Sequence, residues 1–186
     1  STAAVTLHGT SGAETLIGSL GDDTIAGGGG ADVLIGANGN DTISVADGSF
    51  ARIFGGGGVD TLAFAGSGVS IDFTAIANNR ISSIERLDLT GSGDNIATLA
   101  ASDLFHFSDT YDRHFTAAAD DEALVVDGDS GDSLNLKAGP GAWDLIGNDV
   151  GLDGSAGGDY DIYAYSASGG QLGFVAVDKD VGTNLI

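Results

Sequence analysis

The chain has 186 residues, a formal net charge of −21, and 42% hydrophobic residues together with 32 glycines. This hydrophobic content excludes a generic disordered polyanion, and the negative charge argues against nucleic acid or an anionic membrane as a partner. The sequence lacks cysteine, which excludes disulfides and thiolate metal sites, and it has no apolar run of transmembrane length, so we expect no membrane insertion.

A nine-residue pattern fills residues 9–44 in four copies and returns once at 55–63. Each copy carries glycine at its first and fourth positions, an acid at its sixth and Leu or Ile at its eighth. The glycines allow a sharp turn, and the aliphatic and β-branched residues that end each copy favour a short strand. A fixed period of this kind indicates stacked units that share one core. The five acids are Glu14, Asp23, Asp32, Asp41 and Asp60.

Stacking of these units would bring carboxylates together, which is repulsive without a cation. Carboxylates and inward-pointing turn carbonyls are hard oxygen ligands, the set that Ca²⁺ prefers, whereas Mg²⁺ demands a tighter octahedron. We therefore predict calcium sites in the turns. A flexible linker is less favoured, because it has no reason to keep an acid and an aliphatic residue in register. A phosphate-binding loop is also less favoured, because no Gly-Lys-Ser/Thr follows the glycines.

The five copies resemble the RTX nonapeptide repeat, GGxGxDxUx, in which U is a large aliphatic residue. The resemblance implies a parallel β-roll whose turns alternate between two edges, with each Ca²⁺ between turn n and turn n+2. It implies about four ions, held by the carboxylates of Asp23, Asp32, Asp41 and Asp60.

Two further acids and several turn residues complete the metal site that the resemblance implies. Glu14 stands where the family has Asp, and Asp47 supplies a partial turn in the interrupting segment 45–54. The turn residues of the predicted site are Gly18, Leu20, Asp22, Gly27, Gly29, Ala31, Gly36, Asn38 and Asn40.

Three degenerate segments follow the glycine turns, at 62–73, 87–99 and 124–136. Each reads as a strand, a Gly-Ser-Gly-like turn and a second strand, with the alternation of apolar residues that is typical of half-buried strands. Because the full calcium pattern is missing from these turns, we expect them to form coils with little or no metal.

The segments between and after these coils predict local elements. A short helical turn is expected within 74–85, and a helix near Ser102–Phe107. Two alternating runs flank Ser168-Gly169-Gly170, which predicts an antiparallel hairpin over 159–180. Such a hairpin would cover the open end of the solenoid.

Two groups of side chains in the carboxyl-terminal half have alternative interpretations. Asp127, Asp129 and Asp132 offer clustered oxygens, which predicts either another Ca²⁺ site or a plain turn. Tyr163 and Tyr165 in the hairpin predict either a sugar-stacking face or cross-strand packing.

The long excursion at 97–123 contains a mixed group of possible transition-metal ligands, namely His106, Asp109, Asp112 and His114. Their spacing matches no known motif, which favours a solvated loop. The chain has no GxSxG motif and no cysteine nucleophile, so we predict that it is not an enzyme.

The sequence as a whole predicts an all-β protein, in which a calcium-binding parallel β-roll at 1–63 precedes a less regular β-solenoid or β-sandwich with a capping hairpin at 64–186. The predicted function is Ca²⁺ binding that triggers folding and rigidity. The resemblance implies export through type I secretion machinery and a secreted or bacterial cell-surface location. It also implies a fragment from the carboxyl-terminal region of a large RTX protein, with an adhesin as one option. The alternatives are an adhesin module that binds a cell-surface sugar or peptide, and an accessory module of a secreted enzyme.

Overall fold

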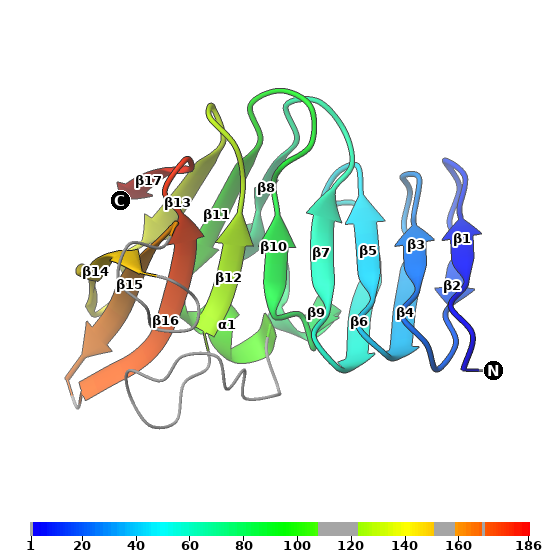
Figure 1. Cartoon of the computed structure of the whole chain (residues 1–186), viewed down its shortest axis with the longest axis horizontal. Coiled ribbons are helices and arrows are strands. Elements are labelled where there is room, and N and C mark those ends of the chain that lie inside the picture. Colours follow the sequence, from blue (N-terminus) through cyan, green and yellow to red (C-terminus); the bar gives the residue numbers. More distant parts are fainter. Residues whose placement is uncertain (1, 108–122, 151–158, 169) are drawn as a thin grey trace.

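The computed structural model describes residues 2–107, 123–150, 159–168 and 170–186, which form a row of stacked coils built from β-strands (Figure 1). In the amino-terminal part, successive strands alternate between a long front sheet and a back wall, so each coil has two strands and two turns. The two ends of the chain lie toward opposite ends of the row.

The front sheet has nine strands in the order β1-β3-β5-β7-β10-β12-β16-β15-β14. In chain order these are β1 (Thr6–His8), β3 (Thr24–Ala26), β5 (Thr42–Val45), β7 (Thr61–Phe64), β10 (Arg86–Asp88), β12 (Ala123–Asp127), β14 (Ala142–Val150), β15 (Tyr160–Ala167) and β16 (Gly170–Asp178). The strands pair in parallel from β1 to β16, whereas β14, β15 and β16 pair antiparallel.

The back wall consists of two four-stranded parallel sheets. The first contains β2 (Thr15–Ile17), β4 (Val33–Asn38), β6 (Arg52–Gly57) and β9 (Ile81–Ser82). The second contains β8 (Ser70–Asp72), β11 (Ile96–Ala100), β13 (Ser133–Lys137) and β17 (Gly182–Leu185). The wall therefore changes from one sheet to another while the front sheet continues.

The aliphatic position of each repeat forms a continuous row inside the coils. Along the front sheet the row runs in register through Leu7, Ile25, Ile43, Leu62 and Leu87. All of these except Leu7, which lies in the first coil, have no exposed surface. Burial of one such side chain contributes roughly 1.5–3 kcal/mol, which a short unit gains only when its neighbours stack on it.

The β-roll passes into the following solenoid without a break in the front sheet, because β7 pairs with β10 as it does with β5. One cluster of buried apolar side chains extends from Ile25 to Val181. These findings confirm the predicted all-β fold with a parallel β-roll. The division between 1–63 and 64–186 stays a prediction.

The degenerate segments form the predicted strand-turn-strand units, as β7–β8, β10–β11 and β12–β13. The short helical turn expected within 74–85 is the 3₁₀ helix η2 (Asn78–Arg80), and a second one, η1 (Phe73–Ala75), precedes it. The expected helix is α1 (Ala101–Phe107). Strands β15 and β16 form the predicted antiparallel hairpin, which extends the front sheet at its carboxyl-terminal end. No helix in the described part of the chain is long and apolar enough to cross a membrane.

The interruption in the repeats is accommodated by one extra residue in a turn between β5 and β6. The side chain of Phe50 enters the core and is only 2% exposed. The guanidinium of Arg80 lies 5.2 Å from the centre of the Phe50 ring and donates a hydrogen bond to the carbonyl of Ala51. The insertion therefore packs as part of a coil.

Candidate metal centre

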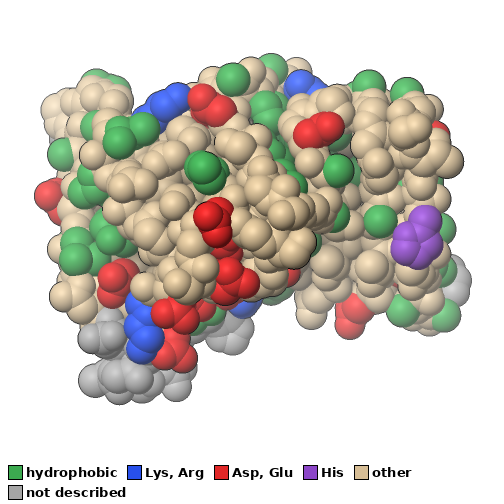
Figure 2. All heavy atoms as spheres, turned by 90° about the horizontal axis from the view of Figure 1, so that it is seen from above, with side chains coloured by type: hydrophobic (Ala, Val, Ile, Leu, Met, Phe, Trp, Pro, Cys, Tyr) green, Lys and Arg blue, Asp and Glu red, His purple; other side chains and the backbone are tan. Residues whose placement is uncertain are grey.

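The turns of the β-roll lie at two opposite edges, one after the front strands and one after the back strands (Figure 1). Turns 9–14, 27–32 and 46–51 follow front strands and share the upper edge of Figure 1. Turn 18–23 follows back strand β2, and turns 36–41 and 55–60 begin in the last three residues of back strands β4 and β6; all three share the lower edge. In the view from above, backbone atoms and side chains that are neither hydrophobic nor charged form most of the upper edge at its amino-terminal end (Figure 2).

At the lower edge four acids stack from coil to coil, and we call them the acid column: Asp23, Asp41, Asp60 and Glu85. The backbone N–H of Asp23 donates to Oδ1 of Asp41 at 2.7 Å, and that of Asp41 to Oδ1 of Asp60 at 2.8 Å. The N–H of Asp60 donates to Oε2 of Glu85 at 2.8 Å. Each of these side chains is at most 2% exposed. One carboxylate oxygen of the later acid thus satisfies a buried amide of the earlier coil.

Glu85 is a member of this column that the sequence prediction missed. It lies outside the nine-residue pattern, as the last residue of a bend of only three residues, 83–85. A signal was present, because Glu85 directly precedes strand β10, as Asp41 precedes β5 and Asp60 precedes β7. The order of an acid followed by a strand identifies the column better than the glycines do.

The other carboxylate oxygens of Asp23 and Asp41, the two Oδ2 atoms, face small spaces that a side chain larger than that of glycine would fill. A Cβ on Gly36 would overlap both Oδ2 of Asp41 and the carbonyl oxygen of Gly55. A Cβ on Gly18 would in the same way overlap Oδ2 of Asp23 and the carbonyl oxygen of Gly36. These glycines therefore bring a carboxylate and a carbonyl oxygen to one small space between successive turns.

This arrangement fits a hard cation. Among the described residues, Oδ2 of Asp41 is buried and has no hydrogen-bond partner. An unsatisfied buried carboxylate oxygen costs free energy, and an ion bound by it and a carbonyl would remove that cost. Carboxylate and carbonyl oxygens from two turns are the donor set of Ca²⁺. The residues present therefore fit calcium at this edge.

Burial acts differently on two members of the column. Burial raises the pKa of Asp41, because the hydrogen bond from the Asp23 amide compensates only part of the cost and the nearby charges of Asp23 and Asp22 add to it. Burial also opposes ionisation of Asp23, but hydrogen bonds from the amides of Ser19 and Val5 and from the Ser19 hydroxyl outweigh it and lower the pKa of Asp23. A cation would help most at Asp41.

The upper edge carries a shorter version of the same arrangement. The N–H of Glu14 donates to Oδ1 of Asp32 at 2.9 Å, and Asp32 is 2% exposed. The carboxylate of Glu14 accepts hydrogen bonds from the amide and hydroxyl of Thr10 in its own turn, which lower its pKa. In the next coil, Ala51 occupies the position at which the repeats have an acid, and the N–H of Ala51 donates a hydrogen bond to the carbonyl of Asp32. The stack of acids at this edge therefore ends at Asp32.

The other predicted turn residues take several places. Asp47 Oδ1 accepts a hydrogen bond from the amide of Ser49 at 2.8 Å, and Asp47 lines a small hollow with Asp32. Leu20 is 51% exposed. Positive φ angles occur at Gly29 and at Ala37, which precedes Asn38. The roles of Gly27, Gly29, Ala31, Asn38 and Leu20 as backbone ligands stay predictions.

The fifth turn position forms an outer ladder at the lower edge. Oδ1 of Asp22 accepts from the N–H of Asn40 at 2.7 Å, and Oδ1 of Asn40 accepts from the N–H of Val59 at 2.8 Å. These side-chain oxygens join successive turns beside the acid column. A role of Asp22 and Asn40 as calcium ligands through their backbone carbonyls stays a prediction.

The carboxyl-terminal candidates have partners within the protein. Asp127 forms an ion pair with Arg86 and accepts a hydrogen bond from Tyr160. Both oxygens of Asp132 accept backbone amides, from Asn95 and from Asp129. Within the described residues, no group of three or more His, Cys, Asp or Glu side chains is placed to hold a metal ion. The sites in the roll therefore depend on carbonyls as well as carboxylates.

The aromatic residues of the hairpin region pack in the core. Tyr165 is 4% exposed, and its ring centre lies 5.2 Å from that of Trp143. Its hydroxyl accepts a hydrogen bond from the amide of Gly141. Tyr163 is half-buried against the same core. Packing, the second of the two predicted interpretations, describes this group.

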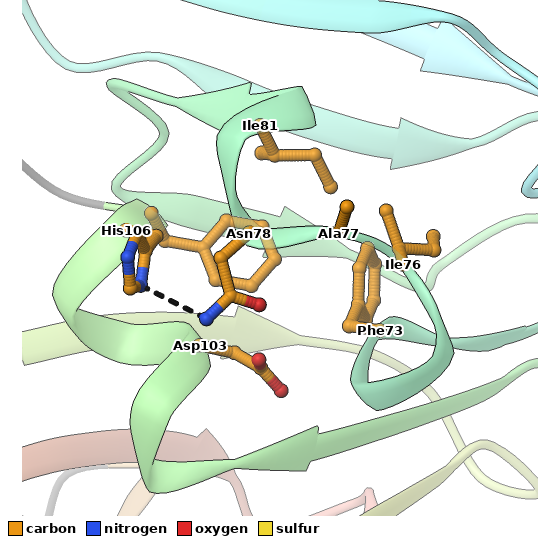
Figure 3. Close-up of a pocket in the computed structure, with 8 residues that line it drawn as sticks. Phe73, Ile76, Ala77, Asn78, Ile81, Asp103 and His106 are labelled. Carbon is orange, nitrogen blue, oxygen red and sulfur yellow. Dashed lines mark hydrogen bonds between the residues drawn. The ribbon is translucent and has the colours of Figure 1, made fainter.

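His106 and Asp103 on α1 border a hollow that is otherwise mainly apolar, with Phe73 and Ile76 among its residues (Figure 3). Nδ1 of His106 lies 2.7 Å from the Ser102 carbonyl and 3.3 Å from the Asn78 side-chain nitrogen. Burial raises the pKa of Asp103, against the hydrogen bond it accepts from Ala100. The contact between His106 and Asn78 joins the helix to η2. The other members of the proposed transition-metal group lie outside the described residues: Asp109, Asp112 and His114.

Stacked coils with carboxylates and carbonyls gathered between their turns define a metal-binding repeat protein. Residues 8–43 match the family model of the RTX calcium-binding nonapeptide repeat, in four copies. This part of the chain is an array of RTX repeats, and calcium is the ion that these repeats bind. A search of curated proteins gave no match, and a search of solved structures gave none.

Proposed function

We propose that calcium triggers the folding of this module and makes it rigid, and that about four ions bind. The observation that carries the proposal is the buried acid column, in which Oδ2 of Asp41 has no hydrogen-bond partner among the described residues. The column makes the folded coils costly without a cation, because buried carboxylates must give up hydration.

The net charge supports the same proposal. Binding of four Ca²⁺ changes the formal charge from −21 to −13 (−21 + 8). Self-repulsion therefore opposes the compact state until ions bind. An ion that binds the folded form alone stabilises it by about 2.7 kcal/mol at one hundred times its Kd, so several sites together decide whether the coils form.

The proposal is tested by far-UV circular dichroism of the whole chain during a Ca²⁺ titration after chelation, repeated with Mg²⁺. We expect a saturable gain of β-structure with Ca²⁺ and little with Mg²⁺. A chain with its full β signal in chelator, and with no response to Ca²⁺, would contradict calcium-triggered folding.

A matched pair of variants connects the response to the site. In Gly36→Ala the new Cβ overlaps Oδ2 of Asp41 and the Gly55 carbonyl, so we expect at least a tenfold higher Ca²⁺ midpoint, about 1.4 kcal/mol. In Gly182→Ala the nearest atom is 3.5 Å away, so the midpoint should stay as in the wild type. The double variant Asp32→Ala plus Asp41→Ala removes one carboxylate at each edge and should weaken the response further.

Secretion and location extend this proposal. RTX repeats are typical of secreted proteins, which supports a secreted or cell-surface location and export by type I machinery as an unfolded chain. Calcium outside the cell would then complete folding. The alternatives of an adhesin module and of an enzyme's accessory module stay predictions, as does the absence of catalysis. Trp143 and Tyr165 are buried, and Tyr163 is half-buried, so a sugar-stacking face at the hairpin stays a prediction.

A further inference from the structure

The acid column continues one step beyond the glycine-rich repeats. Strand β9 pairs with β6, so that Ile81 lies beside Ile53 and Ser82 beside Phe54. Between the paired positions Phe54–Ser82 and Thr61–Arg86, the chain here passes through only three residues, 83–85, whereas the previous coil uses the six residues 55–60. Although the bend is shorter, Glu85 occupies the position of the column acid and accepts the Asp60 amide.

The oxygens around Gly55 repeat the arrangement seen around Gly18 and Gly36. A Cβ on Gly55 would overlap Oδ2 of Asp60 and the carbonyl oxygen of Ser83. Ser83 therefore supplies the carbonyl that a glycine supplies in the two earlier gaps. The same pair of oxygens, one carboxylate and one carbonyl, recurs at three successive gaps of this edge.

Two features of Ser83 distinguish the bend from an ordinary turn. Its φ is +56°, in the left-handed region that residues other than glycine rarely adopt. Its hydroxyl is buried and has no hydrogen-bond partner in the described part of the chain. A buried hydroxyl of this kind is costly unless a ligand satisfies it.

We propose a further Ca²⁺ site between turn 55–60 and the bend at 83–85, formed by the carboxylates of Asp60 and Glu85 and the carbonyl of Ser83. The proposal rests on the function proposed above, but its new ligands lie outside the nonapeptide repeats. Strands β9 and β10 flank the bend, so an ion there joins the last coil of the β-roll to the first coil of the following solenoid.

The direct test uses the wild-type chain and the backbone ¹³C carbonyl resonances during a Ca²⁺ titration, with Mg²⁺ as the control. We expect the carbonyls of Gly36, Gly55 and Ser83 to shift and to saturate with Ca²⁺. If Gly36 and Gly55 respond while Ser83 does not, the further site is wrong and the proposed function stands. If none of the three responds, the proposed function itself fails.

A variant provides an independent count of ions by native mass spectrometry. Glu85→Gln keeps an oxygen for the Asp60 amide but removes the charge, so we expect it to bind one Ca²⁺ fewer than the wild type. Asp144→Asn makes the same charge change at an exposed side chain on β14 and should keep the full number. An unchanged number in a folded Glu85→Gln would overturn the proposal. If that variant does not fold, the Ser83 carbonyl in the wild-type chain still decides.

Discussion

The two edges of the row use the same backbone ladder with different side chains. In the acid column, amides of Asp23, Asp41 and Asp60 donate to the acid of the next coil. At the opposite edge, in the turns that follow β7, β10 and β12, the N–H of Val69 donates to Oδ1 of Asn95 at 2.7 Å, and that of Asn95 to Oδ1 of Asp132 at 2.8 Å. We call Val69, Asn95 and Asp132 the amide column.

The columns differ in what happens to their remaining polar atoms. The side-chain nitrogen of Asn95 donates to the carbonyl of Leu89 at 2.8 Å, and Oδ2 of Asp132 accepts the amide of Asp129 at 2.8 Å. In contrast, Oδ2 of Asp41 has no such partner among the described residues. The ladder itself therefore needs no metal, and the stacked side chain decides whether a coil depends on a cation.

Of the six Lys and Arg residues, Arg52 lies within 1–63 and the other five lie within 64–186. Arg86 pairs with Asp127 at 2.6 Å, and Lys137 pairs with Asp72 at 3.0 Å. These contacts neutralise carboxylates near the amide column. These ion pairs are partly exposed and contribute modestly to stability, but they lower the repulsion among nearby carboxylates. In the acid column we expect calcium to lower it instead.

The largest expected effect is the response of the two columns to calcium removal. We expect chelation to remove hydrogen-exchange protection from the amides of Asp23, Asp41 and Asp60, while those of Val69 and Asn95 keep most of theirs. Exchange measured by mass spectrometry or NMR, with and without chelator, tests this difference. Equal loss in both columns would show that the β-roll and the coils after it fold as one calcium-dependent unit.

Core substitutions should sharpen the comparison. Ile43→Ala and Leu134→Ala each remove a fully buried aliphatic side chain, and each should cost about 2–5 kcal/mol. Denaturant unfolding at several Ca²⁺ concentrations measures the loss. Excess Ca²⁺ should restore much of the stability of Ile43→Ala, because ions bind in the same coils, and little of that of Leu134→Ala. Equal rescue of the two variants would contradict a calcium dependence confined to the roll.

A third prediction concerns a variant in which the amide column receives an acidic side chain like those of the acid column. Asn95→Asp removes the bond to Leu89 and places a carboxylate beside Asp132, so we expect a loss of about 1–3 kcal/mol in chelator. The thermal midpoint in chelator and in Ca²⁺ measures this change. Partial recovery with Ca²⁺ would show that the acid alone creates metal dependence, whereas no destabilisation at all would contradict the role given to the Asn95 amide.

The smallest effect concerns the hydrogen bond between Tyr160 and Asp127 at high pH. Burial, together with the hydrogen bond to Asp127, raises the pKa of Tyr160 to about 12 from 10.0. The folded state thus favours the protonated phenol, so its contribution is present below pH 10 and is lost as the pH rises toward 12. Ultraviolet titration of the phenolates should show a component that ionises near pH 12 and that the control variant Tyr160→Phe lacks. That variant should cost about 1 kcal/mol near neutral pH.

Much of the architecture was predictable because the repeats state their period directly. The position of Ile25 and Ile43 within each unit fixes which side chain points inward, and the repeat pattern predicted the coils and three of the four acids of the column, all except Glu85. The hairpin over 159–180 followed from two alternating runs about a glycine turn. Local patterns of this kind are strong because every unit repeats them.

The members missed by sequence reasoning depend on pairing between distant segments. Glu85 joins the column only because β9 pairs with β6, and Asn95 acts as a column residue only through the amide of Val69. Each of the two residues directly precedes a strand, but that position alone does not reveal its hydrogen-bond partner. The packing of Tyr165 on Trp143 likewise results from the pairing of β14 with β15.

The spacing of the ladder has a consequence for how such a chain can change in length during evolution. Asp23 bonds to a residue 18 positions away and Asp41 to one 19 positions away, so each coil recognises only its immediate neighbour and tolerates one extra residue. Duplication or deletion of a segment of about this size would leave every remaining contact in register. A gene encoding such a row can therefore lengthen by whole coils, and each added coil brings its own acids and its own demand for calcium.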